Sequence, residues 1–277
     1  MSELNFSCAP FDQIGHLRQT LGANWTALEV LNSALKNVLM PSAVTLKFVE
    51  QDKQLLSDGL SFEQRIANRG EIATRVANLH DFYSALMWLR FPKVKLAINA
   101  IHLRGIAEHG TKVRSRHQQA VTHLDEAGAW VVATHSQLLD LIDAHAWHAL
   151  FFENRQAWQP QNCTSPAIEA RVFGHAIFEL MHAPHKLVAA KVVWIRADAN
   201  YFLLSNFEKD AALDTIVAAA LTSGAASADP KLLSTLPLSG IPGWWAGQDA
   251  EFYANAPCFR PRPEARIYSP ALQLATS

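Results

Sequence analysis

The sequence predicts an α+β fold, with a small antiparallel sheet packed against several helices and an ordered C-terminal arm rich in proline and tryptophan. Helical and strand patterns are mixed along the chain without a regular β-α-β alternation. Residues 188–195 are nearly all apolar, which predicts a central strand covered on both faces. From residue 236 onwards proline, glycine and aromatic residues dominate, and Trp244 and Trp245 are too large to leave in water.

Helices are predicted where apolar residues recur at helical spacing behind a capping residue or before a proline. They span residues 25–39, 79–89, 94–101, 136–153, 167–181 and 205–221. The second helix has Asn78 as its N-cap and ends before Pro92, because proline lacks the backbone N–H and restricts its predecessor. The last helix begins with the capping box Ser205–Glu208 and is followed by Gly224, a residue typical of helix ends.

Strands are predicted at residues 44–49, where apolar side chains mostly alternate, and more weakly at residues 62–67. A β-hairpin is expected from residues 118–124 and 129–134. Between them Asp125 begins a four-residue turn and Gly128 ends it, where glycine is free to adopt a positive φ.

Composition excludes several classes of protein. The chain has 277 residues, 49% of them hydrophobic and 18% charged, which is not the composition of a disordered chain. Its formal net charge of -1 argues against a globally basic nucleic-acid binder, so no nucleic-acid partner is expected. No apolar stretch reaches about 18 residues, so no membrane span is expected.

The chain is expected to form one domain over residues 1–277, because no internal repeat or long linker interrupts it. A helix and strand within residues 25–49 are expected to pack onto a core of residues 62–262. Cys8, Cys163 and Cys258 are few, odd in number and far apart, which fits a reducing compartment. No secretory signal is visible, and the cytoplasm is the expected location.

Five segments together resemble the proteobacterial family DUF3025, a domain of unknown function. They are residues 78–88 (NLHDFYSALMW), 90–92 (RFP), 124–128 (LDEAG), 174–179 (GHAIFE) and 240–245 (GIPGWW). The resemblance covers residues 62–262 and implies a domain of nearly the length of the chain. It implies no chemistry, which has to come from the residues themselves.

His80 and Asp81 are the first candidates for catalysis. Asn78 places both in the first turn of a helix, where the helix dipole stabilises a carboxylate. An imidazole beside it can act as an acid, a base or a metal ligand near neutral pH. A purely structural role, with Asp81 complementing the dipole and His80 bonded to a loop, is the alternative.

His175, Glu179 and His182 recur at helical spacing and are expected on one helix face, with Arg171 one turn earlier. Imidazole and carboxylate groups one turn apart suit zinc, manganese or iron, so His175, Glu179 and His80 are the metal-ligand candidates. A solvated face with an ordinary intrahelical pair is the alternative. Gly174 inside a helix predicts close approach of another backbone or a ligand beside His175.

Arg114 and Arg116 are candidates for binding an anionic substrate, because guanidinium groups grip carboxylates and phosphates through two hydrogen bonds. Trp88, on the helix that carries His80, is a further substrate-binding candidate, and Asp125 is a further catalytic one. Pairing of arginines with Asp125, Glu126 or Asp81 is the competing interpretation.

These candidate residues are compatible with two alternative functions. The first is a cytoplasmic enzyme that acts on a small anionic or polar molecule, for example by hydrolysis assisted by a divalent metal. His80 would be an acid, base or ligand, Asp81 would orient it or bind metal, and Arg116 would hold the anion. The second is a non-catalytic binding or adaptor protein that uses the aromatic C-terminal arm. A concave cavity containing His80 and His175 favours the first, and an exposed Trp244 favours the second.

Overall fold

The computed structural model describes residues 6–22, 24, 26–38, 44–158, 166–182 and 186–275. Residues 25 and 39, the ends of the first predicted helix, and Cys163 lie outside this part of the chain. In it the α-helices are α1 (Gly15–Leu21), α2 (Leu28–Val38), α3 (Phe62–Arg69), α4 (Leu79–Arg90), α5 (Pro92–His109), α6 (Arg116–Ala127), α7 (Ser136–Asp143), α8 (His175–Met181), α9 (Asn206–Ser223) and α10 (Ala250–Asn255). The described strands are β1 (Lys47–Glu50), β2 (Glu71–Thr74), β3 (Gly128–Ala133), β4 (Ile168–Val172), β5 (Ala189–Ala197), β6 (Ser234–Pro237) and β7 (Leu272–Leu274).

The mixture of helices and strands confirms the predicted class, but the main sheet is mixed and not antiparallel. Its order is β4-β3-β5-β6, and β7 pairs with the end of β5 beyond β6. β3 and β5 are parallel neighbours, as are β5 and β7, whereas β4 and β6 run antiparallel to their partners. A parallel pair needs a long crossover, and the chain between β3 and β5 supplies one through α7, β4 and α8.

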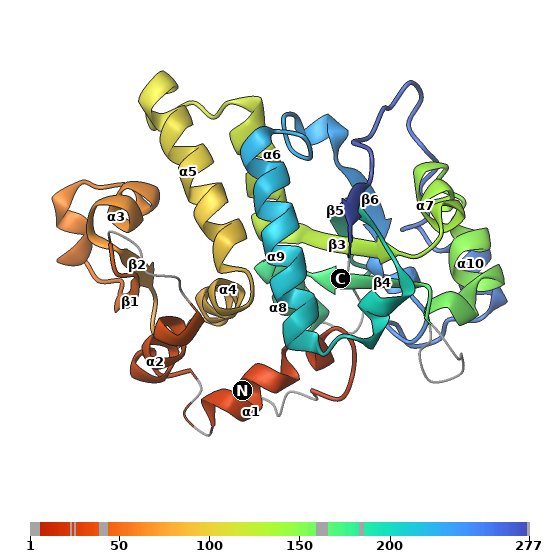
Figure 1. Cartoon of the computed structure of the whole chain (residues 1–277), viewed down its shortest axis with the longest axis horizontal. Coiled ribbons are helices and arrows are strands. Elements are labelled where there is room, and N and C mark those ends of the chain that lie inside the picture. Colours follow the sequence, from red (N-terminus) through yellow and green to blue (C-terminus); the bar gives the residue numbers. More distant parts are fainter. Residues whose placement is uncertain are drawn as a thin grey trace.

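Helices fill the space between this sheet and a second, smaller one. Strands β1 and β2 pair in parallel and lie with α2 and α3 at the left of Figure 1, away from the main sheet at the right. Helices α5, α6 and α9 stand between the two sheets, and α5 packs along α9. Helix α2 contacts both β1 and α4. None of the helices in the described ranges combines the length and apolar character that a membrane crossing requires.

Two predicted strands are helical instead. Residues 62–67 belong to α3, because Ser61 and Gln64 form a capping box at its start. Residues 118–124 belong to α6, which starts with a capping box of Ser115 and Gln118. Apolar residues of α6 at positions 120, 121 and 124 are buried, which is helical spacing. The predicted hairpin is therefore wrong, and Gly128 is extended, with φ -89°.

Two predicted helices are divided. Residues 167–181 form β4 and then α8, because Ile168, Ala170 and Val172 alternate along an edge strand before Gly174 starts the helix. Arg171 therefore lies on a strand and does not extend the face of His175. Residues 136–153 form α7 and a separate π-helical turn, Ala149–Glu153, with a break at His145, whose φ is 54°.

Other predictions are confirmed. α4 begins after Asn78, α5 begins at Pro92, and α9 has its capping box at Ser205 and Glu208 with Gly224 at its end. The strand predicted at residues 188–195 corresponds to β5, which has neighbours on both edges. The described chain beyond residue 236 includes a short 3₁₀-helical turn, Leu238–Gly240, followed by α10 and β7, so the predicted arm has a defined structure.

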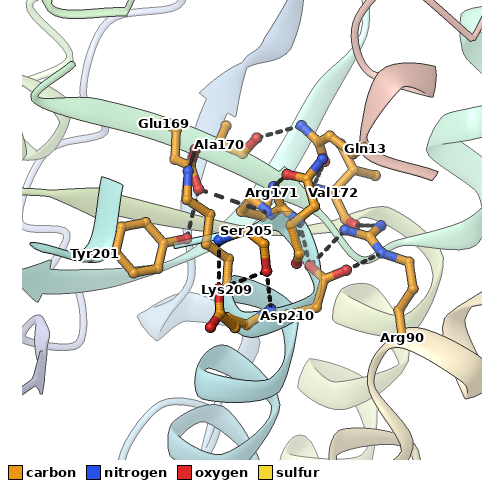
Figure 2. A network of polar contacts seen from close by, with 12 residues as sticks. Gln13, Arg90, Glu169, Ala170, Arg171, Val172, Tyr201, Ser205, Lys209 and Asp210 are labelled. Carbon is orange, nitrogen blue, oxygen red and sulfur yellow. Dashed lines mark hydrogen bonds and ion pairs between the residues drawn. The ribbon is translucent and has the colours of Figure 1, made fainter. Parts of the chain in front are cut away.

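A buried charge network fixes β4 against the helices (Figure 2). Arg90 of α4 forms two hydrogen bonds of 2.8 and 2.9 Å with Asp210 of α9, and Arg171 of β4 donates to the same carboxylate at 2.6 Å. Burial favours protonation of Asp210, but the two guanidinium groups outweigh it and lower its pKa. Gln13 bonds to the backbone of Ala170 and Val172 at 2.8 and 2.9 Å. The network thus sets the position from which the chain enters α8.

Candidate active site

Three helix ends meet at the candidate site. The first turn of α4 carries His80, the first residue of α8 is His175, and the last turn of α6 carries Glu126. The side chain of Asn78 accepts a hydrogen bond from the backbone N–H of Asp81 at 3.0 Å, so the predicted capping of α4 is confirmed. The three side chains come from segments that are distant in sequence and converge only in the folded chain.

Gly174 makes this convergence possible. A Cβ atom at this position would lie 2.3 Å from the backbone nitrogen of Gly128 and 2.5 Å from Cα of Ala127. The backbone N–H groups of Phe173 and Gly174 both donate to the carbonyl of Gly128, at 3.0 and 2.8 Å. The predicted close approach beside His175 is confirmed, and it sets α8 directly against the end of α6.

The imidazoles of His80 and His175 face each other through their Nε2 atoms, which are 2.9 Å apart. Oε2 of Glu126 lies 3.6 Å from Nε2 of His175 and 3.9 Å from Nε2 of His80. One ligand atom from each of the three residues lies within 4.8 Å of the other two. Two imidazole nitrogens and a carboxylate oxygen form a donor set that suits zinc, manganese or iron.

The outer nitrogens of both rings face acidic groups. Nδ1 of His80 is 3.1 Å from Oε2 of Glu179, and Nδ1 of His175 is 4.0 Å from Oδ1 of Asp125. The carboxylate at Nδ1 of His80 is within hydrogen-bond distance and favours the tautomer with the proton there, whereas Nδ1 of His175 has no hydrogen-bond partner among the described residues. The 2.9 Å between the Nε2 atoms is the length of an N–H···N hydrogen bond, in which one ring donates to the other; with both protons on Nδ1, the two Nε2 lone pairs would instead face one place and could hold a cation.

His175 is kept neutral by its surroundings. Its side chain is 5% exposed, and this burial lowers its pKa to about 4, although Asp125 acts in the opposite direction. Asp125 is held in turn by Lys95, whose ammonium lies 2.7 and 3.0 Å from its two carboxylate oxygens. Neutral imidazole is the form that binds a metal, so the ring is in a state suited to coordination.

These groups open into a cavity of about 320 Å³. His80, Glu126 and His175 lie in its wall together with Asp81, Lys95, His102 and Arg114. The lining is also partly apolar and includes Phe48, Phe62 and Ile72. The cavity therefore joins the cluster to a space that a small molecule could enter, between the large helices and the smaller sheet.

A family model described as "Protein of unknown function (DUF3025)" matches residues 46–263. The chain belongs to the DUF3025 family. The match begins before the core predicted from the sequence and includes β1, whose residue Phe48 lines the cavity of this DUF3025 domain. No curated protein and no solved structure shows a significant match to the chain.

The predicted site residues of the DUF3025 domain divide into two groups. His80, His175, Asp125 and Glu179 meet at the cluster, but Glu179 contacts the outer nitrogen of His80 and not the space between the Nε2 atoms. Asp81 lines the cavity, yet both its oxygens bond to Arg75, at 2.7 to 3.0 Å. Burial raises the pKa of Asp81, but these bonds outweigh it and leave a lowered pKa.

Of the three substrate-binding candidates, only Arg114 lines the cavity. Arg114 lines the cavity and is exposed, whereas Arg116 pairs with Asp229 at 2.9 Å and is not part of the wall. Trp88 is buried and does not reach the cavity; the ammonium of Lys95 lies 5.5 Å from the centre of its ring. Trp88 thus supports the residue that holds Asp125.

Glu126 and Lys95 are the site residues that the sequence analysis of this DUF3025 chain did not select. The predicted hairpin puts Glu126 in a turn, whereas it lies in the last turn of helix α6. The capping box at Ser115 and Gln118 was the signal that could have identified that helix. Lys95 follows Trp88 by seven positions on another helix, and no local pattern relates it to Asp125, 30 positions away.

Proposed function

We propose that this protein is a metal-dependent enzyme that hydrolyses a small anionic or polar substrate, with His80, His175 and Glu126 as the protein ligands of a divalent ion. The observation that carries the proposal is the convergence of three ligand atoms within 4.8 Å at the wall of a cavity. Tetrahedral zinc with Zn–N bonds of about 2.0–2.1 Å separates its ligand nitrogens by roughly 3.3 Å. A small outward movement of the two imidazoles gives that spacing.

The surrounding residues have distinct roles in this proposal. Glu179 orients His80, and Asp125, fixed by Lys95, orients His175, as carboxylates behind ligand histidines commonly do. When bound, a divalent ion supplies a Lewis acid and lowers the pKa of water towards about 7. Three protein ligands leave a position open for water or substrate, which is the arrangement of catalytic rather than structural zinc sites.

An anionic substrate is favoured by the cations of the cavity. Arg75 and Lys95 are committed to carboxylates, but the guanidinium of Arg114 forms no ion pair with the described residues. An exposed guanidinium in the wall of the same cavity suits a carboxylate or phosphate. We therefore assign substrate binding to Arg114 and not to Arg116.

Metal binding by the purified chain tests the proposal. We expect one zinc or manganese ion per chain by elemental analysis and calorimetry, and at least a 100-fold loss of affinity in His80→Ala, His175→Ala and Glu126→Gln. The exposed pair Glu108 and His109 offers a matched control, because its carboxylate and Nε2 atoms are also 3.6 Å apart but no third ligand joins them in the described part of the chain. Equal affinity in the site and control variants, or no stoichiometric metal, overturns the proposal.

Hydrolysis is tested separately with p-nitrophenyl phosphate and p-nitrophenyl acetate. We expect turnover that a chelator abolishes, that zinc or manganese restores, and that Glu126→Gln lacks. A protein that binds metal but consumes oxygen in place of water would contradict hydrolysis and leave the metal site intact.

An adaptor function of the C-terminal arm has less support. Trp244 and Trp245 are each half-buried, and Trp244 packs against the main core. We place the enzyme in the cytoplasm on the small, odd number of cysteines. A fluorescent fusion that accumulates outside the cytoplasm would contradict this location.

A further inference from the structure

A second cavity, of about 590 Å³, shares no lining residue with the cavity of the candidate active site. Its floor is formed by β5 and β6 through Ala189, Lys191 and Thr235. Its cover is residues 257–268, which we name the covering segment. The volume is within the range of about 300–1,000 Å³ typical of small-molecule sites.

The walls of this cavity are largely apolar and aromatic. They contain the rings of His145, Trp147 and Tyr268 and a set of leucines and prolines: Leu187, Leu233, Pro237, Pro257, Pro261 and Pro263. The rings of His145 and Tyr268 are nearly parallel, at 6° and 5.9 Å between centres. Flat, rigid rings of this kind offer a surface on which a flat apolar body can pack.

Positive charge in the cavity has no acidic counterpart. Among the described residues that line it are Lys191, Arg260 and Arg266, and none is Asp or Glu. The ammonium of Lys191 donates to Oγ1 of Thr235 at 2.9 Å, and Arg266 donates to the backbone carbonyl of Lys231 at 3.0 Å. These partners are neutral, so neither charge is compensated by them.

The pKa of Lys191 is lowered by its position in this cavity. Burial lowers its pKa, and the charge of Arg266 lowers it further. Two cations in the wall of one half-buried cavity repel each other without an anion. An anionic group between them would remove the repulsion and add charge-assisted hydrogen bonds.

The cavity is also held open by its own hydrogen bonds. Nδ1 of His145 and Nε1 of Trp147 contact the carbonyl of Arg260 at 3.2 and 2.7 Å, and the hydroxyl of Tyr268 lies 3.0 Å from Nε2 of His145. His145 has a positive φ of 54°, which is uncommon outside glycine and is often found at functional sites. The covering segment is thus fixed before any ligand arrives, which reduces the entropy cost of binding.

We propose that this cavity is a binding site for a small organic anion with a flat apolar body. The anionic group lies between Lys191 and Arg266, and the body packs against His145, Trp147 and Tyr268. The site is independent of the proposed metal centre, and either can exist without the other.

Binding of 2-naphthoate to the full chain, measured by calorimetry, tests this site. We expect saturable binding, at least tenfold weaker binding of the neutral analogue 2-naphthylmethanol, and at least tenfold weaker binding of naphthoate to Lys191→Met and Arg266→Met. Lys186→Met is the matched control, because Lys186 is exposed, precedes the same strand and does not line the cavity. It should bind as the unaltered chain does.

A variant that fills the cavity tests the proposal even if Lys191→Met and Arg266→Met fold poorly. Ala189 is exposed on β5 and lines the cavity, so Ala189→Phe fills the space without removing a charge. We expect it to fold and to lose naphthoate binding. No saturable binding to the unaltered chain, equal binding of the neutral analogue, or unchanged binding in Ala189→Phe would each overturn the proposal.

Discussion

His80 and His175 approach to 2.9 Å between their Nε2 atoms, although 95 positions separate them in the sequence. Each ring has an acidic side chain at its outer nitrogen, and Glu126 lies beside the pair. The arrangement depends on packing at the start of α8 as much as on the ligands themselves. Substitutions that disturb this packing and substitutions that remove a donor atom should therefore both weaken metal binding.

Gly174→Ala is expected to disrupt the packing of the start of α8 against the end of α6. The new methyl group would lie 2.3 Å from the nitrogen of Gly128, so α8 must move away from α6. We expect the free energy of unfolding to fall by about 1–3 kcal/mol and zinc affinity to fall with it. Urea unfolding and calorimetry measure the two effects.

Gly15→Ala is the control for Gly174→Ala. Gly15 lies in helical conformation, and its Cβ would meet no atom closer than 3.5 Å. Alanine there should be neutral or stabilising by up to about 1 kcal/mol. Equal stability of the two variants would contradict the role given to Gly174.

Substitution of Glu126 and substitution of Glu179 should reduce zinc affinity by different amounts. Glu126→Gln removes a proposed ligand, whereas Glu179→Gln keeps a hydrogen-bonding group behind His80. We expect a loss of zinc affinity of at least 100-fold for the first and about tenfold for the second, which is typical of groups behind a ligand. The reverse order would restore Glu179 as the ligand expected from the sequence.

Local signals were sufficient for much of the fold. Asn78, Pro92 and the capping box at Ser205 located helix ends correctly, because caps and prolines act on their immediate neighbours. The apolar run at β5 identified a central strand for a similar reason. The close approach expected at Gly174 is also found, but Gly174 is the N-cap of α8 and not an interior helix residue, so the helix-stability cost that suggested the contact does not apply.

Non-local pairing decided the rest. Ile168, Ala170 and Val172 have the spacing of a strand, but this short run leads directly into the helical segment from His175, and pairing with β3 separates the two. The DEAG turn signal at residues 125–128 was overridden because α6 continues to Ala127 and packs against α8. Glu126 joined the site only through that helix, so an error in secondary structure concealed a site residue.

Asp210→Asn is expected to lower the free energy of unfolding, because it disrupts the buried charge network. Removal of this carboxylate leaves Arg90 and Arg171 without their shared partner, which typically costs about 3–5 kcal/mol. The pKa of Asp210 is lower in the folded chain than the unfolded value of about 3.9. Its contribution to stability is therefore present above about pH 4 and lost as the pH falls through the folded pKa.

Urea unfolding of the chain and of Asp210→Asn at pH 7 and at several values below 4 measures this contribution. The difference between the two in free energy of unfolding should shrink on acidification. Asp140→Asn changes an exposed carboxylate and should differ from the unaltered chain by no more than about 0.5 kcal/mol. A pH-independent difference for Asp210→Asn would contradict the depressed pKa.

Arg114 and Arg116 provide the last comparison, because the two arginines are close in sequence but only Arg114 lines the cavity. Arg116 already forms two hydrogen bonds with Asp229, so its charge is engaged elsewhere. With inorganic phosphate as the probe and zinc-loaded protein, Arg114→Gln should weaken binding about tenfold, the loss of one charge-assisted hydrogen bond. Arg116→Gln removes the same charge from the same helix region and should leave phosphate binding unchanged. Equal effects of both variants would mean that phosphate senses only the overall charge of the chain, and the assignment of Arg114 to the substrate would be wrong.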